Sequence, residues 1–247
     1  MLRATKRAGY GKVSLNLGTA SVNTNCTRRT PIPWLAWLLP ALVIALAFAQ
    51  EVVSISDAQI AKLAQQFGPV AKERLTGWRD LMNNPKNRAV QERQKLQLVN
   101  DYMNRTPFVS DMEHWGKEDY WASPIEFLST NGGDCEDFSI AKYFTLRALG
   151  VPDEKLQITY VKEIRVYNEA HMVLAYFATA DAEPVILDNI NKTIQPASTR
   201  TDLVPVYSFN GSGLWLAKEQ TGRGQSVGSS DRIGHWKDLQ SRMRSAI

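Results

Sequence analysis

The sequence predicts an α+β fold, in which a group of helices comes first in the chain and an antiparallel sheet follows. Between residues 57 and 149, apolar side chains recur at spacings of three and four, which is the period of helices packed on a core. After Gly150, short runs of apolar and β-branched residues take over, as is typical of strands. The two patterns do not alternate along the chain, which argues against a doubly wound parallel sheet. The 247 residues, 44% of them hydrophobic, are enough to bury one substantial core.

The first 49 residues have the features of a cleaved secretory signal peptide. Residues 1–33 carry six basic side chains and no acidic one, and the apolar run Trp34–Ala49 ends in Ala47-Phe48-Ala49. A basic segment, an apolar segment and an Ala-x-Ala site together predict export and cleavage after residue 49. The apolar run has sixteen residues, fewer than the roughly 20 that a membrane-spanning helix needs. A retained anchor is the alternative.

The basic character of the chain belongs to this leader. The whole sequence has a net charge of +4. Removing residues 1–49 takes away six Lys and Arg, which leaves 23 basic and 25 acidic side chains in 198 residues and a net charge of −2. No later stretch interleaves basic and aromatic residues as a nucleic-acid surface does. We therefore expect no nucleic-acid partner.

Four helices are expected before the sheet. A serine or aspartate cap begins the first, Gly68-Pro69 separates it from the second, and Gly150 ends the last. The segment 105–133 is irregular and aromatic, and Gly132-Gly133 closes it. The predicted helices are Asp57–Phe67, Pro69–Met82, residues 88–104 and Cys135–Leu149.

Five strands are expected after Gly150, and a tail follows them. Residues 219–230 are rich in Gly, Ser and Gln, which predicts a flexible linker, and residues 236–243 have the spacing of a short surface helix. The expected organisation is a signal peptide (1–49), one domain (50–218) and a linker with a short tail (219–247). The predicted strands are Leu156–Val161, His171–Phe177, Val185–Leu187, Val204–Phe209 and Leu214–Ala217.

Cys135 is the one cysteine that remains when the leader, which contains Cys26, is removed. An exported protein with an unpaired thiol is unusual, because oxidising compartments tend to pair or exploit thiols. Cys135 opens a predicted helix directly after Gly132-Gly133-Asp134, where the helix dipole favours a thiolate. Its backbone amide is also placed to donate to an oxyanion. The alternative is a buried structural cysteine, which is the common state of a free thiol.

His171 and Asp188 favour the catalytic interpretation of Cys135. His171 begins one predicted strand, and Asp188 ends the next. If these strands pair as antiparallel neighbours, both side chains lie at one edge of the sheet. A thiolate–imidazole pair with a carboxylate that orients the imidazole is the working set of a cysteine peptidase or acyltransferase. Taken singly, a histidine or aspartate at a strand end is more often a structural hydrogen-bonding residue.

Asp134, Glu136 and Asp137 surround the cysteine with carboxylates. Negative charge next to a thiol opposes thiolate formation. Several hard oxygen ligands within four residues suit Ca²⁺, which would neutralise them, although the spacing is not that of an EF-hand loop. Acidic residues in the first turn of a helix also complement its dipole without any metal. On the residues alone, both interpretations stay open.

Several segments around these residues resemble the bacterial transglutaminase-like cysteine proteinases. The likeness runs from about residue 67 to residue 218, and it is greatest toward the periplasmic members that release large adhesins from the cell surface. The segments that carry it are Gly133–Phe138, Ile140–Tyr143, Ala170–Leu174, Leu187–Asn189, Asp119–Ala122 and Pro205–Asn210.

The resemblance implies a papain-like, transglutaminase-like core with Cys135, His171 and Asp188 as the catalytic triad. It also implies dependence on Ca²⁺, held by the three acidic residues next to the cysteine, Asp134, Glu136 and Asp137. Within this triad His171 is expected to act as the base, and Asp188 to orient it. The second oxyanion donor has no clear sequence marker, and the segment Trp115–Trp121 is the candidate region.

The resemblance also implies a substrate, a regulator and a location. The substrate is the N-terminal region of a very large repeat adhesin, cut beside a pair of alanines, so that the adhesin is released and the biofilm disperses. The regulator is an inner-membrane receptor for cyclic di-GMP that sequesters the protease in the periplasm. No stable membrane insertion is expected once the signal peptide is cleaved.

Two other functions are compatible with the same residues. A transglutaminase or a cell-wall amidase could use the same triad, because acyl-enzyme chemistry does not fix the acceptor. A calcium-binding adaptor with a degenerate site is the alternative from a different class of protein.

Overall fold

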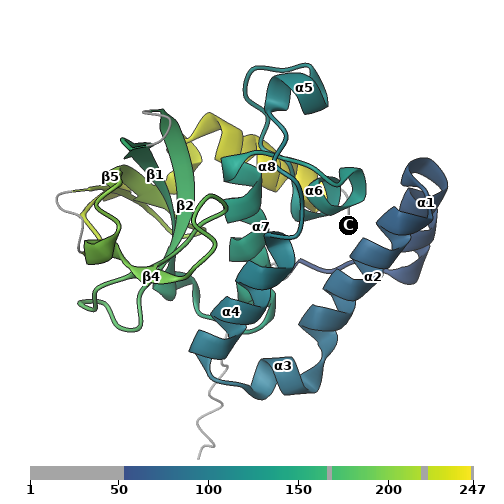
Figure 1. Ribbon diagram of the computed structural model, residues 1–247, viewed down its shortest axis with the longest axis horizontal. Helices are drawn as coiled ribbons and strands as arrows, with labels where there is room; N and C mark the ends of the chain where they lie inside the picture. Colours follow the sequence, from purple (N-terminus) through teal and green to yellow (C-terminus); the bar gives the residue numbers. More distant parts are fainter. Residues whose placement is uncertain (1–52, 166–168, 218–221, 246–247) are drawn as a thin grey trace, which may run out of the picture. The chain divides into compact units, whose positions relative to one another are not determined.

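The computed structural model describes residues 53–165, 169–217 and 222–245 of the chain (Figure 1). The predicted signal peptide, residues 1–49, lies outside the described residues, as does part of the predicted linker. Within the described segments, no helix combines the length and the apolar character that crossing a bilayer requires.

The helices precede the sheet in the chain, as the sequence predicts, with one exception at the C-terminal end. The predicted third helix is in fact two, because Val90 and Gln91 are extended and separate α3 from α4. The irregular aromatic segment contains α5 and α6, which Ser110 and Ser123 cap and which are too short to show a period. The α-helices are α1 (Asp57–Phe67), α2 (Pro69–Asn83), α3 (Pro85–Ala89), α4 (Glu92–Met103), α5 (Asp111–Trp115), α6 (Pro124–Thr130), α7 (Cys135–Ala148) and α8 (Gly234–Ser245). Single 3₁₀ turns are η1 (Asp153–Lys155), η2 (Ala197–Thr199) and η3 (Ser230–Arg232).

The strands form one antiparallel sheet of seven in the order β4-β3-β2-β1-β5-β6-β7. The five predicted strands are confirmed within a residue or two. The strand of His171 and its successor pair as antiparallel neighbours, β2 against β3, which is the condition for His171 and Asp188 to meet. The strands are β1 (Leu156–Glu163), β2 (Ala170–Tyr176), β3 (Val185–Leu187), β4 (Gln195–Pro196), β5 (Leu203–Phe209), β6 (Leu214–Leu216) and β7 (Gln225–Gly228).

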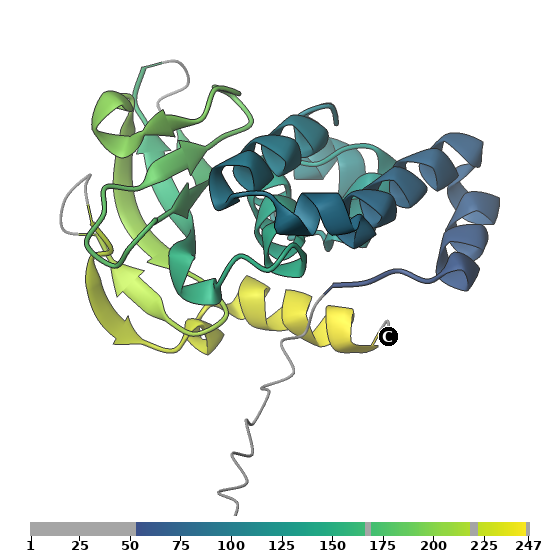
Figure 2. The same ribbon diagram turned by 90° about the horizontal axis from the view of Figure 1, so that it is seen from below.

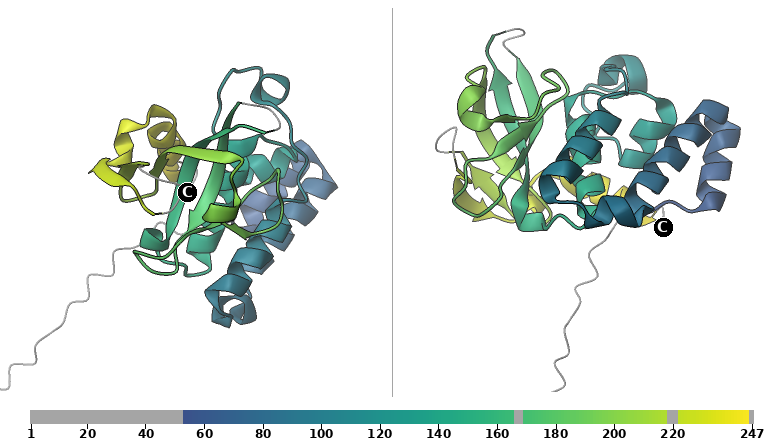
Figure 3. Two further views of the ribbon diagram at one scale, coloured as in Figure 1. Left: turned by 60° about the vertical axis from the view of Figure 1, so that its left-hand side comes forward. Right: turned by 60° about the horizontal axis from the view of Figure 1, so that its bottom comes forward.

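Helix α7 is the central element of the helical layer and packs on one face of the sheet against β1 and β2 (Figures 1 and 3). Nearly all of its side chains are buried, polar ones such as Lys142 and Thr145 included, so the helix is enclosed on most sides rather than exposed along one face. The indole of Trp78 on α2 donates to Thr145 Oγ1 of α7 at 2.8 Å. A second apolar cluster, which includes Val173, Ala175 and Phe177 of β2 and its extension, covers the other face of the sheet.

The helix predicted for residues 236–243 is present as α8, but it is not a surface helix, and the described part of the predicted linker contains a strand. Residues 225–228 pair with β6 as an edge strand, and their side chains are mostly exposed, so they show no apolar alternation. Helix α8 is part of the main core, because Trp236 and Leu239 are fully buried. Trp236 stacks on Phe144 of α7 at 5.6 Å between ring centroids and meets Phe209 of β5 edge-on at 5.2 Å. Figure 2 shows α8, in yellow, running along one side of the helical layer.

This packing predicts the effect of truncating Trp236. Trp236→Ala should lower the free energy of unfolding by about 3–5 kcal/mol, because it empties a fully buried aromatic site. Urea denaturation followed by far-ultraviolet circular dichroism measures it. Lys237→Ala, at the next and exposed position of α8, is the control and should stay within about 0.5 kcal/mol of wild type. A loss below about 1 kcal/mol for Trp236→Ala would mean that α8 does not belong to the core.

Candidate active site

Cys135 is the first residue of α7 and lies beside the start of β2. A Cβ at Gly133 would clash with Asp137 Oδ2, so a glycine is needed for the chain to enter the helix this closely. The Cys135 side chain is partly exposed. Its Sγ donates to Glu136 Oε2 at 3.0 Å, and the backbone of Met172 also makes a hydrogen bond with the thiol.

Ser139, one turn further along α7, fixes the helix to β2 at this point. Its hydroxyl lies 3.0 Å from the carbonyl oxygen of Cys135 and 3.0 Å from that of Met172, the residue after His171. This serine was not among the predicted site residues. The one sequence feature that could have indicated it is its position, two residues after Cys-Glu-Asp.

His171 and Asp188 are in direct contact. His171 lies second in β2, where it is paired with Val161, and Asp188 follows the last residue of β3. His171 Nε2 lies 2.9 Å from Asp188 Oδ1, and both side chains are almost completely buried. With Nε2 donating its proton to the carboxylate, Nδ1 is the ring nitrogen that accepts a proton.

Arg200 holds the other oxygen of Asp188. Its Nη2 donates to Asp188 Oδ2 at 2.6 Å and to Asp202 Oδ2 at 2.7 Å, and the Ile190 amide donates to Asp188 Oδ1 at 3.0 Å. Burial alone would raise the pKa of Asp188, but the hydrogen bond with His171, with the Arg200 charge adding to it, holds this pKa well below its usual range. Asp188 is therefore a carboxylate that stays ionised and is held in one position. Arg200 was not predicted from the sequence, because it follows a single 3₁₀ turn and belongs to no recognisable pattern.

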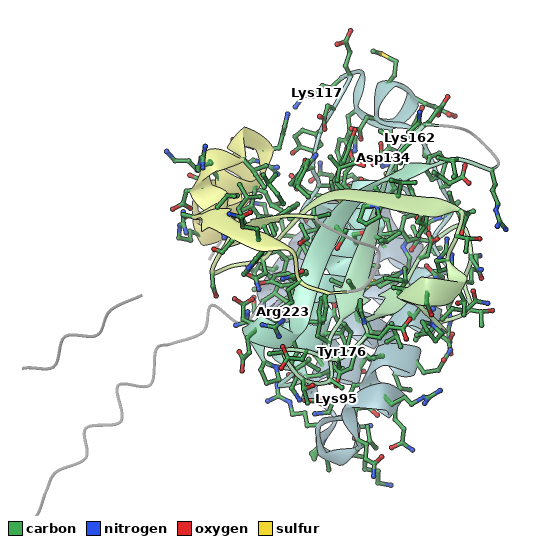
Figure 4. The ribbon with its side chains drawn as sticks, turned by 90° about the vertical axis from the view of Figure 1, so that its left-hand side faces the viewer. Lys95, Lys117, Asp134, Lys162, Tyr176 and Arg223 are labelled. Carbon is green, nitrogen blue, oxygen red and sulfur yellow. The ribbon has the colours of Figure 1, made fainter. Side chains whose placement is uncertain are left out.

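Cys135 and His171 face one cavity of about 460 Å³ at the end of the sheet where β1 ends and β2 begins. In Figure 4, Asp134 and Lys162 mark this end of the sheet, and Tyr176 marks the opposite end. The wall is partly apolar and partly acidic. Its residues are Phe108, Cys135, Glu163, Glu169, Ala170, His171, Asn189 and Ile190.

The acidic residues next to Cys135 belong to a larger set. Carboxylate oxygens lie within 4.8 Å of one another in two overlapping groups, which share one aspartate of α5. Asp111 of that helix and Asp119 of the following loop were not among the predicted metal ligands, because they are distant in sequence. The groups are Asp111, Asp119 and Glu136, and Asp111, Asp134 and Asp137. We call these five residues the acidic set.

Three oxygens of the acidic set lack any partner among the described residues, and the ion pair of Asp119 with His235 lies at the exposed edge of the set. Asp111 Oδ1, Asp134 Oδ1 and Asp137 Oδ2 are buried and have no hydrogen-bond partner in the described part of the chain. Burial, with the Glu136 charge adding to it, raises the pKa of Asp134 to about 9. Burial and the same carboxylates raise the pKa of the Cys135 thiol well above its usual value. Unpartnered carboxylate oxygens gathered in this way fit a divalent cation with hard oxygen ligands.

Two backbone amides of the loop after α5 orient members of the acidic set. Tyr120 N donates to Asp111 Oδ2, and Ala122 N donates to Asp137 Oδ1 at 2.7 Å. Each aspartate thus has one oxygen held by the loop and one without a partner among the described residues. Hydrogen bonds of this kind fix the direction of a ligand's free oxygen.

The sequence profile of one family, described as bacterial transglutaminase-like cysteine proteinase (BTLCP), matches residues 77–221. The chain belongs to this family. The predicted α+β, papain-like fold and the predicted activity of a cysteine peptidase are thereby confirmed. Among curated proteins, none matches the chain.

Solved structures of one relative cover most of the chain. The EGTA-treated form of LapG from Legionella pneumophila is 43% identical, with a TM-score of 0.66 over 77% of this chain and 98% of that one. Calcium-bound LapG is also 43% identical, with a TM-score of 0.64 over 76% of this chain and 99% of that one.

The depressed pKa of Asp188 predicts how an amide at this position affects stability at different pH. Asp188→Asn should cost about 3 kcal/mol or more near pH 7, because it removes the charged partner of the buried His171 and leaves Arg200 with Asp202 alone. A carboxylate whose pKa is lower in the folded chain stabilises it above its unfolded pKa of about 3.9, and this contribution fades at lower pH. The difference in the free energy of unfolding between wild type and Asp188→Asn, measured by urea denaturation, should therefore narrow as the pH falls from 5 to 3. A gap that widens over this range would contradict the assignment of Asp188 as a fixed anion.

Proposed function

We propose that the protein is a calcium-dependent cysteine endopeptidase in which Cys135 is the nucleophile, His171 the base and Asp188 the group that orients the base. The observation that carries the proposal is the His171–Asp188 hydrogen bond at the cavity that Cys135 also lines. A carboxylate at Nε2 leaves Nδ1 to work with the thiol, which is the division of roles in a cysteine–histidine–carboxylate site.

The reaction follows from these positions. His171 Nδ1 takes the thiol proton, and Cys135 Sγ attacks the carbonyl carbon of the scissile peptide bond, whose π electrons move to the oxygen. The oxyanion accepts a hydrogen bond from the Cys135 amide, which has no intrahelical partner at the first position of α7. When the C–N bond breaks, His171 gives its proton to the departing amine. A water molecule then loses a proton to His171, attacks the thioester and releases the acid and the thiol.

We infer that the acidic set holds a Ca²⁺ ion. The support is the donor set itself, five carboxylates with three buried oxygens that have no partner among the described residues, together with the 43% identity to a protein solved in calcium-bound and EGTA-treated forms. Such an ion supplies positive charge beside Cys135 and so offsets the carboxylates that disfavour its thiolate. Asp134, Glu136 and Asp137 come from the start of α7, and Asp111 and Asp119 come from the preceding segment.

We propose as substrate the N-terminal region of a large repeat adhesin, cut beside a pair of alanines, so that the adhesin is released and the biofilm disperses. The resemblance of the sequence to adhesin-releasing proteases supports this substrate, and the apolar wall formed by Phe108, Ala170 and Ile190 suits small apolar side chains. The same resemblance supports a periplasmic location after cleavage of the leader. It also supports restraint by an inner-membrane receptor for cyclic di-GMP.

Loss of the nucleophile tests the peptidase. Cys135→Ser should lower cleavage of adhesin N-terminal fragments at least about 1,000-fold while leaving the urea midpoint close to that of wild type. Mass spectrometry of the products measures the rate and the cleavage site. In a parallel reaction with a primary-amine probe, hydrolysis should exceed amine incorporation. If amine incorporation dominates, the enzyme is a transglutaminase, and full cleavage by Cys135→Ser would refute the nucleophile.

Removal of divalent ions tests the calcium site. Excess chelator should abolish cleavage, and Ca²⁺ should restore it better than Mg²⁺, which demands a tighter octahedron than this wide set of carboxylates provides. Asp119→Asn should raise the Ca²⁺ concentration for half-maximal activity about tenfold, since it removes one ligand charge. The Asp119 side chain is 52% exposed, so this variant should fold. Full activity of wild type in excess chelator would refute the metal.

A further inference from the structure

Arg242 connects the C-terminal helix α8 to the loop that precedes α6. Its Nη1 donates to the Tyr120 hydroxyl at 3.0 Å and to Glu126 Oε2 at 2.8 Å, and its Nη2 donates to the Trp121 carbonyl at 2.5 Å. The fourth partner, Asp238, lies one turn earlier on α8 and accepts from Nε at 2.8 Å. Every nitrogen of the guanidinium is therefore engaged, and three of these bonds leave α8 for the loop and the start of α6.

Tyr120 is the residue of the loop that Arg242 restrains most. The Arg242 guanidinium lies 4.7 Å from the centre of the Tyr120 ring, and Lys117 Nζ also lies over the ring, at 3.9 Å. The Tyr120 hydroxyl donates to Glu126 Oε1 at 2.8 Å. A ring held by two cations and by its hydroxyl has little freedom to rotate, and the backbone attached to it is fixed accordingly.

The restrained backbone is the one that orients the acidic set. Tyr120 N donates to Asp111 Oδ2, and Ala122 N donates to Asp137 Oδ1. The Trp121 carbonyl that accepts from Arg242 lies between these two amides in the chain. A movement of the loop away from α8 would therefore withdraw both amides from the two aspartates.

A second residue of α8 contacts the same loop. His235 Nε2 lies 3.4 Å from Asp119 Oδ2, and the His235 ring stacks on Trp121 with 5.6 Å between ring centroids. Helix α8 thus contacts the loop from its first turn and from its last, and it lies outside the residues 77–221 that match the family profile.

We propose that Arg242 is a positioning residue for the cation site: through the loop 119–122 it holds the acidic set in its binding geometry. The inference rests on the proposed function, because it assumes that the acidic set binds Ca²⁺. On this proposal, the C-terminal helix α8 helps to set the geometry of the metal site.

Positioning and simple electrostatics give effects of opposite sign. Arg242 is a cation near the acidic set, so removing its charge should, by Coulomb interaction alone, make a bound cation more favourable. Loss of positioning should weaken binding, and the loss of groups that orient metal ligands typically costs about 10–100-fold in affinity. The direction of the change therefore separates the two effects.

The test compares Tb³⁺ and Ca²⁺ binding by Arg242→Gln, Arg242→Lys and Lys237→Gln, each as the full mature chain. Tb³⁺ emission excited through nearby tryptophans, Trp121 among them, reports binding without any enzyme assay, and Ca²⁺ competition gives its affinity. Arg242→Gln should bind Ca²⁺ at least about tenfold more weakly than wild type. Arg242→Lys keeps the charge but cannot span the same acceptors, so its Ca²⁺ affinity should lie between those of wild type and Arg242→Gln. Lys237→Gln removes an exposed charge of α8 and should bind as wild type or slightly tighter.

Equal or tighter Ca²⁺ binding by Arg242→Gln would overturn the proposal. Melting temperatures in excess chelator control for folding: weaker binding counts as positioning when the melting temperature of Arg242→Gln or of Arg242→Lys stays within a few degrees of wild type. If both variants unfold, or if affinity falls only in proportion to stability, Arg242 is structural and the proposal fails. If wild type itself binds neither Tb³⁺ nor Ca²⁺, the calcium site of the proposed function is wrong, and cleavage by Cys135 is judged separately from its own assay.

Discussion

The structure depends on one constraint: three carboxylates are placed at the start of a buried helix, directly around the thiol. Helix α7 is enclosed by the other helices and by the sheet, so the acidic side chains of its first turn are largely buried. Burial then raises the pKa values of Asp134 and Asp137, and no described cation pairs with them. Buried charge of this kind is costly unless an opposite charge lies beside it. A bound divalent ion would resolve the conflict, and under the proposed function it would make activity conditional on the ion.

The second half of the site, His171 and Asp188, is built by the sheet, and the charge of Asp188 is balanced by neighbouring side chains. Asp188 is fixed between His171 and Arg200, so its role does not depend on a metal. The two halves meet where Ser139 and the thiol of Cys135 both bond to the backbone of Met172. If the acidic set binds Ca²⁺ as proposed, the histidine–aspartate pair is assembled without the ion and only the surroundings of Cys135 depend on it.

The parts of this arrangement that could be predicted from sequence are those tied to long periodic elements. Cys135 begins a fourteen-residue helix, and His171 and Asp188 lie at the ends of adjacent strands, so strand pairing alone brings the latter two together. Arg200 and Asp111 could not be predicted, because Arg200 follows a single 3₁₀ turn and Asp111 begins a helix of five residues, which are too short to show a pattern. The C-terminal segment differs from its prediction for a related reason: β7 is an edge strand with exposed side chains, and α8, although predicted as a helix, buries only Trp236 and Leu239, too few to mark it as part of the core. In both cases tertiary contacts, not local pattern, fix the position.

The pairing of Cys135 with His171 is tested most directly by the rate at which iodoacetamide alkylates Cys135 at pH 7. Cys135 is the only cysteine after residue 49, so the measurement reports this thiol alone. In Ca²⁺, wild type should react at least about tenfold faster than His171→Gln, because the imidazole keeps the sulfur as the reactive thiolate. Chelation should slow wild type toward the rate of the variant. Equal rates for the two proteins in Ca²⁺ would contradict a thiolate–imidazole pair at this site.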